Sequence, residues 1–167
     1  MSIRITRLIC KLLAATGLVV GTWAAAQAQT AEPAAKPANP QYEPERAKRL
    51  GASPNGMRNY VLVLLKTGPN KVPAGPERNE MFAGHFANIK RLSDEGKLVT
   101  AGPADGVDGW RGIFIFAVKE IEEAKQLTAT DPVIIKGEMV AEYHKMYMSA
   151  ALMEIPEIHK KLSEKLP

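Results

Sequence analysis

The chain has 167 residues, with 22 basic and 18 acidic side chains, a formal net charge of +4 and a single cysteine, Cys10. One cysteine excludes an intrachain disulfide framework and a zinc site built on several cysteines. Glycine-rich phosphate loops, nucleotide fingerprints, a serine-containing elbow and basic stretches with interleaved aromatic residues are absent from the sequence, which disfavours nucleotide and nucleic-acid functions.

The first residues have the pattern of a secretory signal peptide. An apolar run from Leu12 to Ala26 follows three basic residues and ends at Ala26-Gln27-Ala28, a small-x-small cleavage pattern. The basic residues are Arg4, Arg7 and Lys11. The run is shorter than the roughly 20 apolar residues that a membrane helix needs. We expect cleavage after residue 28, a mature chain that begins at Gln29, and a periplasmic or secreted protein.

Loss of this leader changes the net charge of the protein. It would remove three basic residues and no acidic ones, leaving 19 basic against 18 acidic side chains. The mature chain is then almost neutral, so its charge gives no reason to expect nucleic acid or an anionic membrane as partner. Cys10 lies before the apolar run, where a lipid-attachment cysteine does not occur, and it leaves with the leader. We therefore expect no stable membrane anchor and no thiolate nucleophile.

Residues 29–57 are rich in alanine, proline, glutamate and lysine and contain few large apolar residues. Such a segment cannot bury enough surface to offset the entropy lost on ordering, so it is predicted to be a disordered linker. A short helix around 44–50 that docks on the domain is the alternative. The remaining sequence predicts one domain at 58–152 and a helical tail at 153–167 with apolar residues on one side.

The domain is predicted to have the element order β-α-β-β-α-β. Tyr60–Leu65 is a continuous apolar run that indicates a strand buried on both faces. A helix follows from Pro76 and is capped by Gly96. The later elements are strands at 97–101 and 112–118, a helix around 121–127 and a long strand at 139–148. This order is typical of the α+β ferredoxin-like sandwich, with an antiparallel four-stranded sheet and helices on one face.

Three short phrases occur in a fixed order along this domain. They are Asp94-Glu95-Gly96-Lys97-Leu98, Ala101-Gly102-Pro103 and Asp131-Pro132, and they follow a histidine, His85, in the first predicted helix. Over roughly residues 58 to 152 the chain resembles the YciI-like (YCII-related) family of small α+β proteins. The resemblance implies a His/Asp pair as reactive centre and a dimeric α/β-barrel assembly in which two sheets pack face to face as a homodimer.

His85 lies on the apolar side of its helix, four residues from both Met81 and Ile89. From spacing alone it can be a neutral core histidine hydrogen-bonded to backbone. The resemblance favours the other interpretation, a catalytic general acid or base, for which an unperturbed pKa near 6.5 is suitable.

Asp131 also has two interpretations. An aspartate directly before a proline is typical of an N-cap followed by proline in the first helical turn. The same carboxylate can accept the N–H of His85, fix its tautomer and stabilise the imidazolium. We predict the catalytic residues to be His85 and Asp131, in direct or water-bridged contact.

Four further residues are candidates for substrate binding. Gly102 and Pro103 end a strand, either as a plain turn or as a place where a ligand approaches the backbone. Trp110 and Arg111 form either a wall for an anionic planar ligand or an ordinary exposed hairpin. His144 alternates with Tyr143 and Tyr147 on the last strand, and the sequence does not tell which side faces the interior. His85 and His144 lack metal-ligand spacing, so we expect no metal and no cofactor.

The sequence therefore predicts a periplasmic homodimer with a cleft containing His85. The leading hypothesis is a cofactor-free small-molecule enzyme that moves a proton on an organic acid, in an isomerase, lyase or dehydrochlorinase type of reaction. The alternative is a non-catalytic protein that binds a small ligand or supports an envelope complex. An imidazole that is paired and reachable by solvent favours the enzyme, whereas a cleft filled by Phe82 and Phe86 weakens it.

Overall fold

The computed structural model describes residues 39–164, so the predicted leader and its cleavage site lie outside the described residues. Helices and strands follow the order α1 (Pro44–Arg49), β1 (Met57–Thr67), α2 (Pro76–Asp94), β2 (Leu98–Pro103), η1 (Val107–Gly109), β3 (Trp110–Phe116), α3 (Ile121–Thr128), α4 (Pro132–Ile135), β4 (Met139–Ser149), η2 (Ala150–Glu154) and α5 (Ile155–Leu162). Within 39–164, no helix combines the length and the apolar character needed to cross a membrane.

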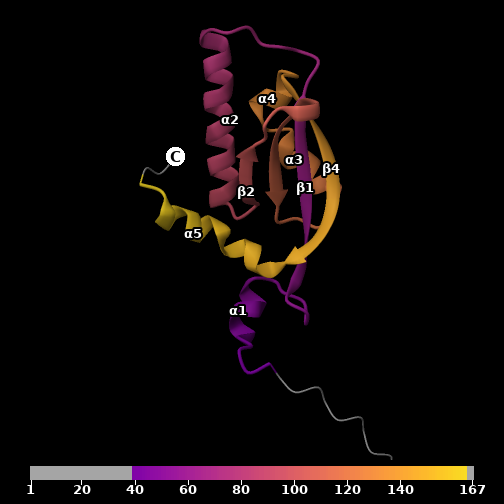
Figure 1. The fold of residues 1–167 in the computed structure, drawn as a ribbon, viewed down its shortest axis with the longest axis vertical. Helices are drawn as coiled ribbons and strands as arrows, with labels where there is room; N and C mark the ends of the chain where they lie inside the picture. Colours follow the sequence, from indigo (N-terminus) through magenta and orange to yellow (C-terminus); the bar gives the residue numbers. More distant parts are fainter. Residues whose placement is uncertain (1–38, 165–167) are drawn as a thin grey trace, which may run out of the picture. The chain divides into compact units, whose positions relative to one another are not determined.

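The four strands form one antiparallel sheet in the order β2-β3-β1-β4 (Figure 1). The predicted β-α-β-β-α-β order and the α+β ferredoxin-like fold class are confirmed, with α4 added between α3 and β4. β1 lies between β3 and β4, as its apolar sequence indicates. Apolar side chains on both faces of β1 are buried or half-buried, which is the environment that a continuous apolar run indicates.

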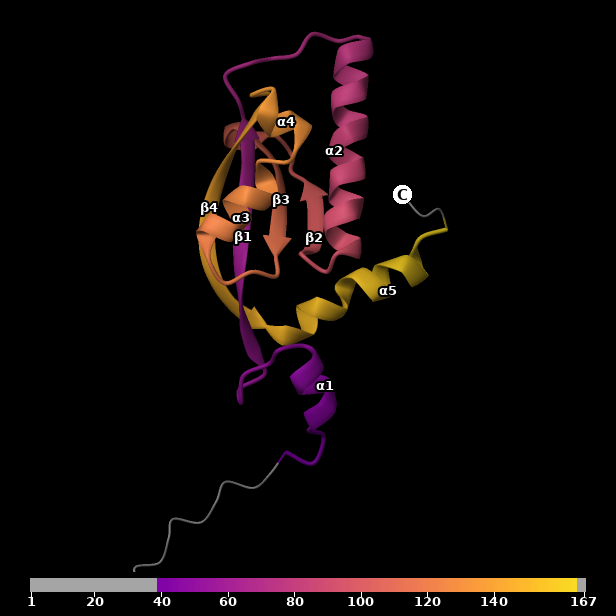
Figure 2. The same cartoon turned by 180° about the vertical axis from the view of Figure 1, so that it is seen from behind.

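One face of the sheet packs against the helices and forms the core. Val61, Val63 and Leu65 of β1 project into it, together with Phe114 and Phe116 of β3. Each of the five is almost fully buried. α2 lies over the β2 side of this face and α3 lies nearer β4, as the two opposite views show (Figures 1 and 2). Among residues 39–164, the helices leave the second face of the sheet without a helical cover.

That second face mixes apolar and charged side chains. On β1 and β3, Leu62 lies opposite Ile115 and Leu64 opposite Ile113. On β4, Glu142 and His144 belong to the same face, and the nitrogen Nε2 of His144 lies 2.8 Å from a Glu142 carboxylate oxygen. Tyr143 instead packs against the core. The structure thus decides the orientation of β4 that the alternating sequence leaves open.

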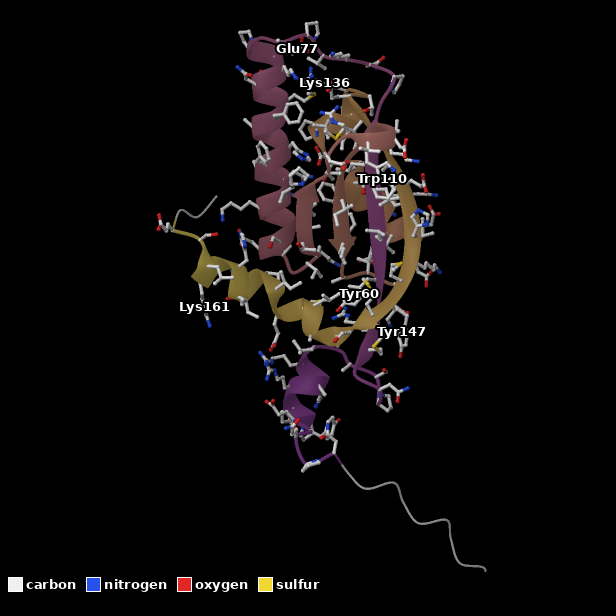
Figure 3. All side chains as sticks on the ribbon, viewed as in Figure 1. Tyr60, Glu77, Trp110, Lys136, Tyr147 and Lys161 are labelled. Atoms are coloured by element: carbon white, nitrogen blue, oxygen red, sulfur yellow. The ribbon has the colours of Figure 1, made fainter. Side chains whose placement is uncertain are left out.

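The two ends of the domain contact each other. Arg46 of α1 donates to the carboxylate of Glu154 in η2, with Nε 2.9 Å from Oε1. Tyr147 of β4 donates to Ser53 Oγ at 2.8 Å, at the end of the sheet near α1 (Figure 3). The predicted disorder of residues 29–57 is wrong for residues 44–49, where the alternative helix is present. The segment gains its order from ion pairs and side-chain hydrogen bonds rather than from apolar burial, which composition does not register.

Candidate functional site

Helix α2 carries a buried polar pair on its inner face. Met81, His85, Asn88 and Leu92 are its buried residues, at spacings of three and four. Two of the four, His85 and Asn88, are polar, and a buried polar side chain requires a partner that satisfies it. The partners come from the segment that leads into α4.

The imidazole of His85 contacts the carboxylate of Asp131 directly. His85 Nδ1 lies 2.8 Å from Oδ2 and 3.0 Å from Oδ1 of Asp131. Asp131 has no exposed surface and His85 is 7 % exposed. Since an ionised carboxylate can only accept hydrogen bonds, Nδ1 is the protonated nitrogen that donates. The geometric part of the sequence hypothesis is therefore present, whereas the catalytic role of the pair stays a prediction.

Asp131 makes both contacts considered for it. Its Oδ1 accepts the backbone N–H of Val133 at 3.1 Å, which makes it the N-cap of α4 with Pro132 in the first turn. A carboxylate fixed by a cap has little freedom to rotate away from its second partner. The cap thus holds the oxygen that His85 requires.

Contacts with α2 hold the α4 segment on both sides of Asp131. Gly84 lies against the ring of Pro132, and Lys136 at the end of α4 donates to Glu77 at the start of α2 at 2.7 Å (Figure 3). On the other side, Asn88 Oδ1 lies 3.0 Å from Thr130 Oγ1. Successive turns of α2 therefore determine where the carboxylate stands relative to His85.

Three phenylalanine rings surround the imidazole. Phe114 stacks at 6.0 Å between centroids, Phe86 lies at 5.4 Å and Phe82 at 6.1 Å. Phe82 and Phe86 thus pack against the imidazole, and the predicted cleft containing His85 stays a prediction. Phe82 lies three residues before His85 and therefore shares its side of the helix, whereas Phe86 is its neighbour in sequence.

The second ring nitrogen of His85 nonetheless remains in contact with solvent. Within residues 39–164, Nε2 has no hydrogen-bond partner, and Asn88 Nδ2 is the one buried side-chain nitrogen or oxygen left unsatisfied. Nε2 therefore retains accessible surface. With the proton on Nδ1, Nε2 carries the free lone pair and is the atom that can accept a proton.

A largely apolar hollow of about 300 Å³ lies beside Phe86, one of the rings that contact His85. It lies among α2, β2 and α5, and Phe86, Ile89 and Val99 contribute to its wall. Phe86 is 61 % exposed and also touches the His85 ring. Phe86 thus contacts the imidazole on one side and contributes to the wall of the hollow on the other.

The substrate-binding role of Gly102, Pro103, Trp110 and Arg111 stays a prediction, and the structure places the four residues at the end of β2 and the start of β3. Gly102 and Pro103 are at the end of the edge strand β2, and a Cβ placed on Gly102 would have open space around it. Trp110 is 39 % exposed and pairs with Lys66 on β1. Arg111 lines a different hollow, near the end of β1. Ala101, the residue before Gly102, pairs with Phe114, whose ring stacks on His85.

Asn88 is the polar residue of this site that sequence inspection missed. It is 8 % exposed, its Oδ1 accepts from Arg91 at 2.7 Å, and its Nδ2 is the unsatisfied donor. Its position three residues after His85, on the same helix face, was the available signal. Within the described residues, no cluster of three or more histidine, cysteine, aspartate or glutamate side chains could hold a metal ion.

Comparison with known proteins identifies the family of this domain. The family model described as YCII-related domain matches residues 59–146. Among solved structures, the chain is similar to 5-chloro-2-hydroxyhydroquinone dehydrochlorinase (TftG) from Burkholderia phenoliruptrix AC1100 in complex with 2,5-dihydroxybenzoquinone. Identity is 19 %, the TM-score is 0.38, and the match covers 52 % of this chain and 90 % of that chain. No curated protein matches the chain. Because the family model spans more than half of the sequence, the chain belongs to the YCII-related domain family.

Proposed function

We propose that this protein is a cofactor-free enzyme that moves a proton on a small organic molecule, with His85 as general base. The observation that carries the proposal is the 2.8 Å contact between His85 Nδ1 and Asp131. In the neutral imidazole that donates from Nδ1, Nε2 is the nitrogen free to accept a proton. A histidine is suited to this task near neutral pH because its unperturbed pKa is about 6.5.

In this proposal Asp131 acts through His85. The buried carboxylate keeps the proton on Nδ1 and stabilises the imidazolium once Nε2 has taken a proton from carbon or oxygen of the substrate. The phenylalanine rings exclude water from the other sides of the imidazole. The apolar hollow between α2, β2 and α5 is the proposed binding place for the organic part of the substrate, and rotation of the exposed Phe86 side chain exposes Nε2 to it.

Deuterium exchange tests the chemistry on many compounds at once, so that no single substrate has to be chosen. A panel of small carbonyl acids and hydroxyquinones is incubated with protein in D₂O, and carbon-bound hydrogen exchange is followed by NMR. We expect one or more compounds to exchange with wild-type protein and to lose at least about 10²-fold in rate with His85→Gln. His144→Gln is the matched control, because it removes an exposed histidine on the opposite sheet face. Equal exchange in the His85→Gln protein would refute the assignment of the base.

The second candidate is a non-catalytic protein that binds a small ligand in the apolar hollow or supports an envelope complex. The shielding of His85, at 7 % exposure, is the observation that favours it. It predicts that a panel compound binds saturably to wild-type and His85→Gln protein with the same affinity and that no compound exchanges hydrogen.

The assembly and location of the protein form part of the proposal. We propose a homodimer through the second sheet face and export after cleavage before Gln29. Export is checked by the intact mass of the protein recovered from the periplasm, which is expected to correspond to residues 29–167 without lipid.

A further inference from the structure

A second hollow, of about 360 Å³, lies near the end of β1, at the level where α2 begins. Its charged lining residues are Lys71, Arg78, Arg111 and Glu138, and the polar Asn70 contributes as well. The four charged residues come from the loop after β1, from α2, from the start of β3 and from the residue before β4. None of them belongs to the His85/Asp131 pair.

Glu138 is a buried carboxylate at the base of this hollow. It is 2 % exposed, and its oxygens meet the backbone N–H of Val72 at 2.8 Å, Arg78 Nη1 at 2.8 Å and Arg111 Nη1 at 3.5 Å. Burial by itself raises the pKa of Glu138, but the Val72 N–H and the two guanidinium groups outweigh it and hold the pKa below its ordinary value. The carboxylate is therefore ionised at neutral pH and fixes the two arginines.

The positive charge in the hollow exceeds what Glu138 neutralises. One carboxylate faces two guanidinium groups and the ammonium of Lys71, a local excess of about two positive charges at neutral pH. The side chains of Arg78 and Arg111 are 24 % and 28 % exposed, so part of each guanidinium faces the hollow. Each guanidinium has five N–H donors, and the single carboxylate cannot occupy them all.

Arg111 reaches this position through an irregularity in the sheet. Leu65 pairs with Gly112 and Lys66 with Trp110, so Arg111 has no partner on β1 and occupies a β-bulge. Bulges redirect a side chain and are common beside functional sites. Arg78 is held independently, because its Nη1 also donates to the Val72 carbonyl and its guanidinium stacks 4.9 Å above the Phe82 ring.

We propose that this hollow is an oxyanion-binding site, which takes the carboxylate or phosphate group of a small molecule between Arg78 and Arg111. The planar guanidinium fork matches the paired oxygens of either group, and such charge-assisted hydrogen bonds are roughly twice as strong as neutral ones. Glu138 positions both arginines without touching the ligand. This proposal does not depend on the proton-transfer function: the anion site can be present even if His85 is not catalytic.

NMR titration of the full chain with sodium benzoate, inorganic phosphate and the uncharged benzyl alcohol, at constant ionic strength and pH 7, tests the site. The probes are the backbone N–H of Val72 and the Nε–H of Arg111. We expect saturable shifts with an oxyanion and none at these probes with benzyl alcohol. Tighter binding of benzoate identifies a carboxylate ligand, and tighter binding of phosphate a phosphate ligand.

Arg111→Gln removes one positive charge from the proposed site and is compared with a variant that removes one elsewhere. Arg111 makes only the long 3.5 Å contact with Glu138, which keeps Arg78 and Val72 as partners. We expect a loss of affinity of tenfold or more in this variant, and a change below about twofold in Lys145→Gln, which removes one exposed charge elsewhere on β4. The Val72 signal reports binding in both variants.

Three outcomes would overturn the proposal: shifts that do not saturate with either anion, equal responses to benzoate and benzyl alcohol, or unchanged affinity in a folded Arg111→Gln protein. Should that variant unfold, the comparison of benzoate with benzyl alcohol in wild-type protein still decides.

Discussion

Gly84 on α2 lies directly against Pro132 on α4: a Cβ on Gly84 would stand 2.9 Å from the Pro132 Cγ atom. Gly84 precedes His85 and Pro132 follows Asp131, so the point of closest approach lies beside the His85–Asp131 hydrogen bond. A glycine inside a helix costs about 1 kcal/mol relative to alanine. The close packing of α2 against α4 explains why a glycine occupies this helical position despite that cost.

Gly84→Ala is expected to move α4 away from α2 and weaken the His85–Asp131 contact. The gain in helix propensity, about 1 kcal/mol, offsets part of the clash, so the change in unfolding free energy is small. The informative measurement is the ¹⁵N shift of His85 Nδ1, which should move toward that of an unpaired imidazole. Gly102→Ala, where a Cβ meets open space, is the control. An unchanged His85 spectrum in Gly84→Ala would mean that the cap, not the helix approach, fixes the pair.

His85→Ala is expected to destabilise the protein by about 2 to 4 kcal/mol, because it opens a cavity among three phenylalanine rings and strands the buried Asp131 carboxylate. His85→Gln keeps a hydrogen-bond donor in place and should cost about half as much. Urea unfolding measures both values. The exposed His144→Gln should lie within about 0.5 kcal/mol of wild type.

Asp131→Asn tests the positioning role of the carboxylate. Asparagine caps a helix nearly as well as aspartate, so α4 should persist. An amide can donate to Nδ1, which would shift the proton of His85 to Nε2 and remove the base. We expect the ¹⁵N spectrum of His85 to show the Nε2–H tautomer and proton-exchange activity to fall by about 10²-fold or more. A variant that keeps the Nδ1–H tautomer and full activity would contradict the role given to Asp131.

Glu138 should make the stability of the domain depend on pH in the acid range. Its pKa is lower in the folded protein than in the unfolded chain. Its contribution is therefore fully present above the unfolded value of about 4.3 and is lost as the pH falls through the folded pKa. We expect Glu138→Gln to be less stable than wild type at pH 7, by about 1 to 3 kcal/mol, and the difference to shrink as the pH falls below about 4.

Chemical denaturation at pH 7, 5 and 3.5 measures this difference. The control is Glu142→Gln, whose pKa is also lowered, first by the hydrogen bond from Lys66, but which is exposed to solvent. Water screens that pair, so its pH-dependent difference should be much smaller. Equal pH profiles for the two variants would show that the contacts of Glu138 with Val72, Arg78 and Arg111 stabilise no more than an exposed ion pair does.

The uncovered sheet face predicts a dimer in solution. Leu62, Leu64, Ile113 and Ile115 are neighbours there, and apolar patches beyond about 300 to 600 Å² are uncommon on monomers. Light scattering at micromolar concentration should report twice the chain mass. Leu62→Glu should give monomers, and Ile158→Glu, an exposed position on α5, should leave the dimer intact. Monomeric wild-type protein would contradict the assembly.

The elements of the domain were predictable because each depends on neighbours in sequence. The apolar run at Tyr60–Leu65 predicts the central strand, Gly96 marks the end of α2, and Asp131-Pro132 marks the start of α4. The identity of His85 and Asp131 as a pair came from resemblance, since 46 residues separate them. The helix at 44–49 was only the alternative to a disordered linker, because its partner, Glu154, lies 108 residues away from Arg46.

What the sequence by itself determined was the α+β element order and the residue types available for chemistry, because helix stripes, strand alternation and turn residues are local properties of the chain. Only the tertiary structure decided which side chains meet. It packed Phe82 and Phe86 against His85, directed Arg111 through a bulge toward Glu138 and paired Ala101 with Phe114, which stacks on the histidine. These relationships depend on strand register and on the distance between α2 and α4, which are set by packing across the whole domain.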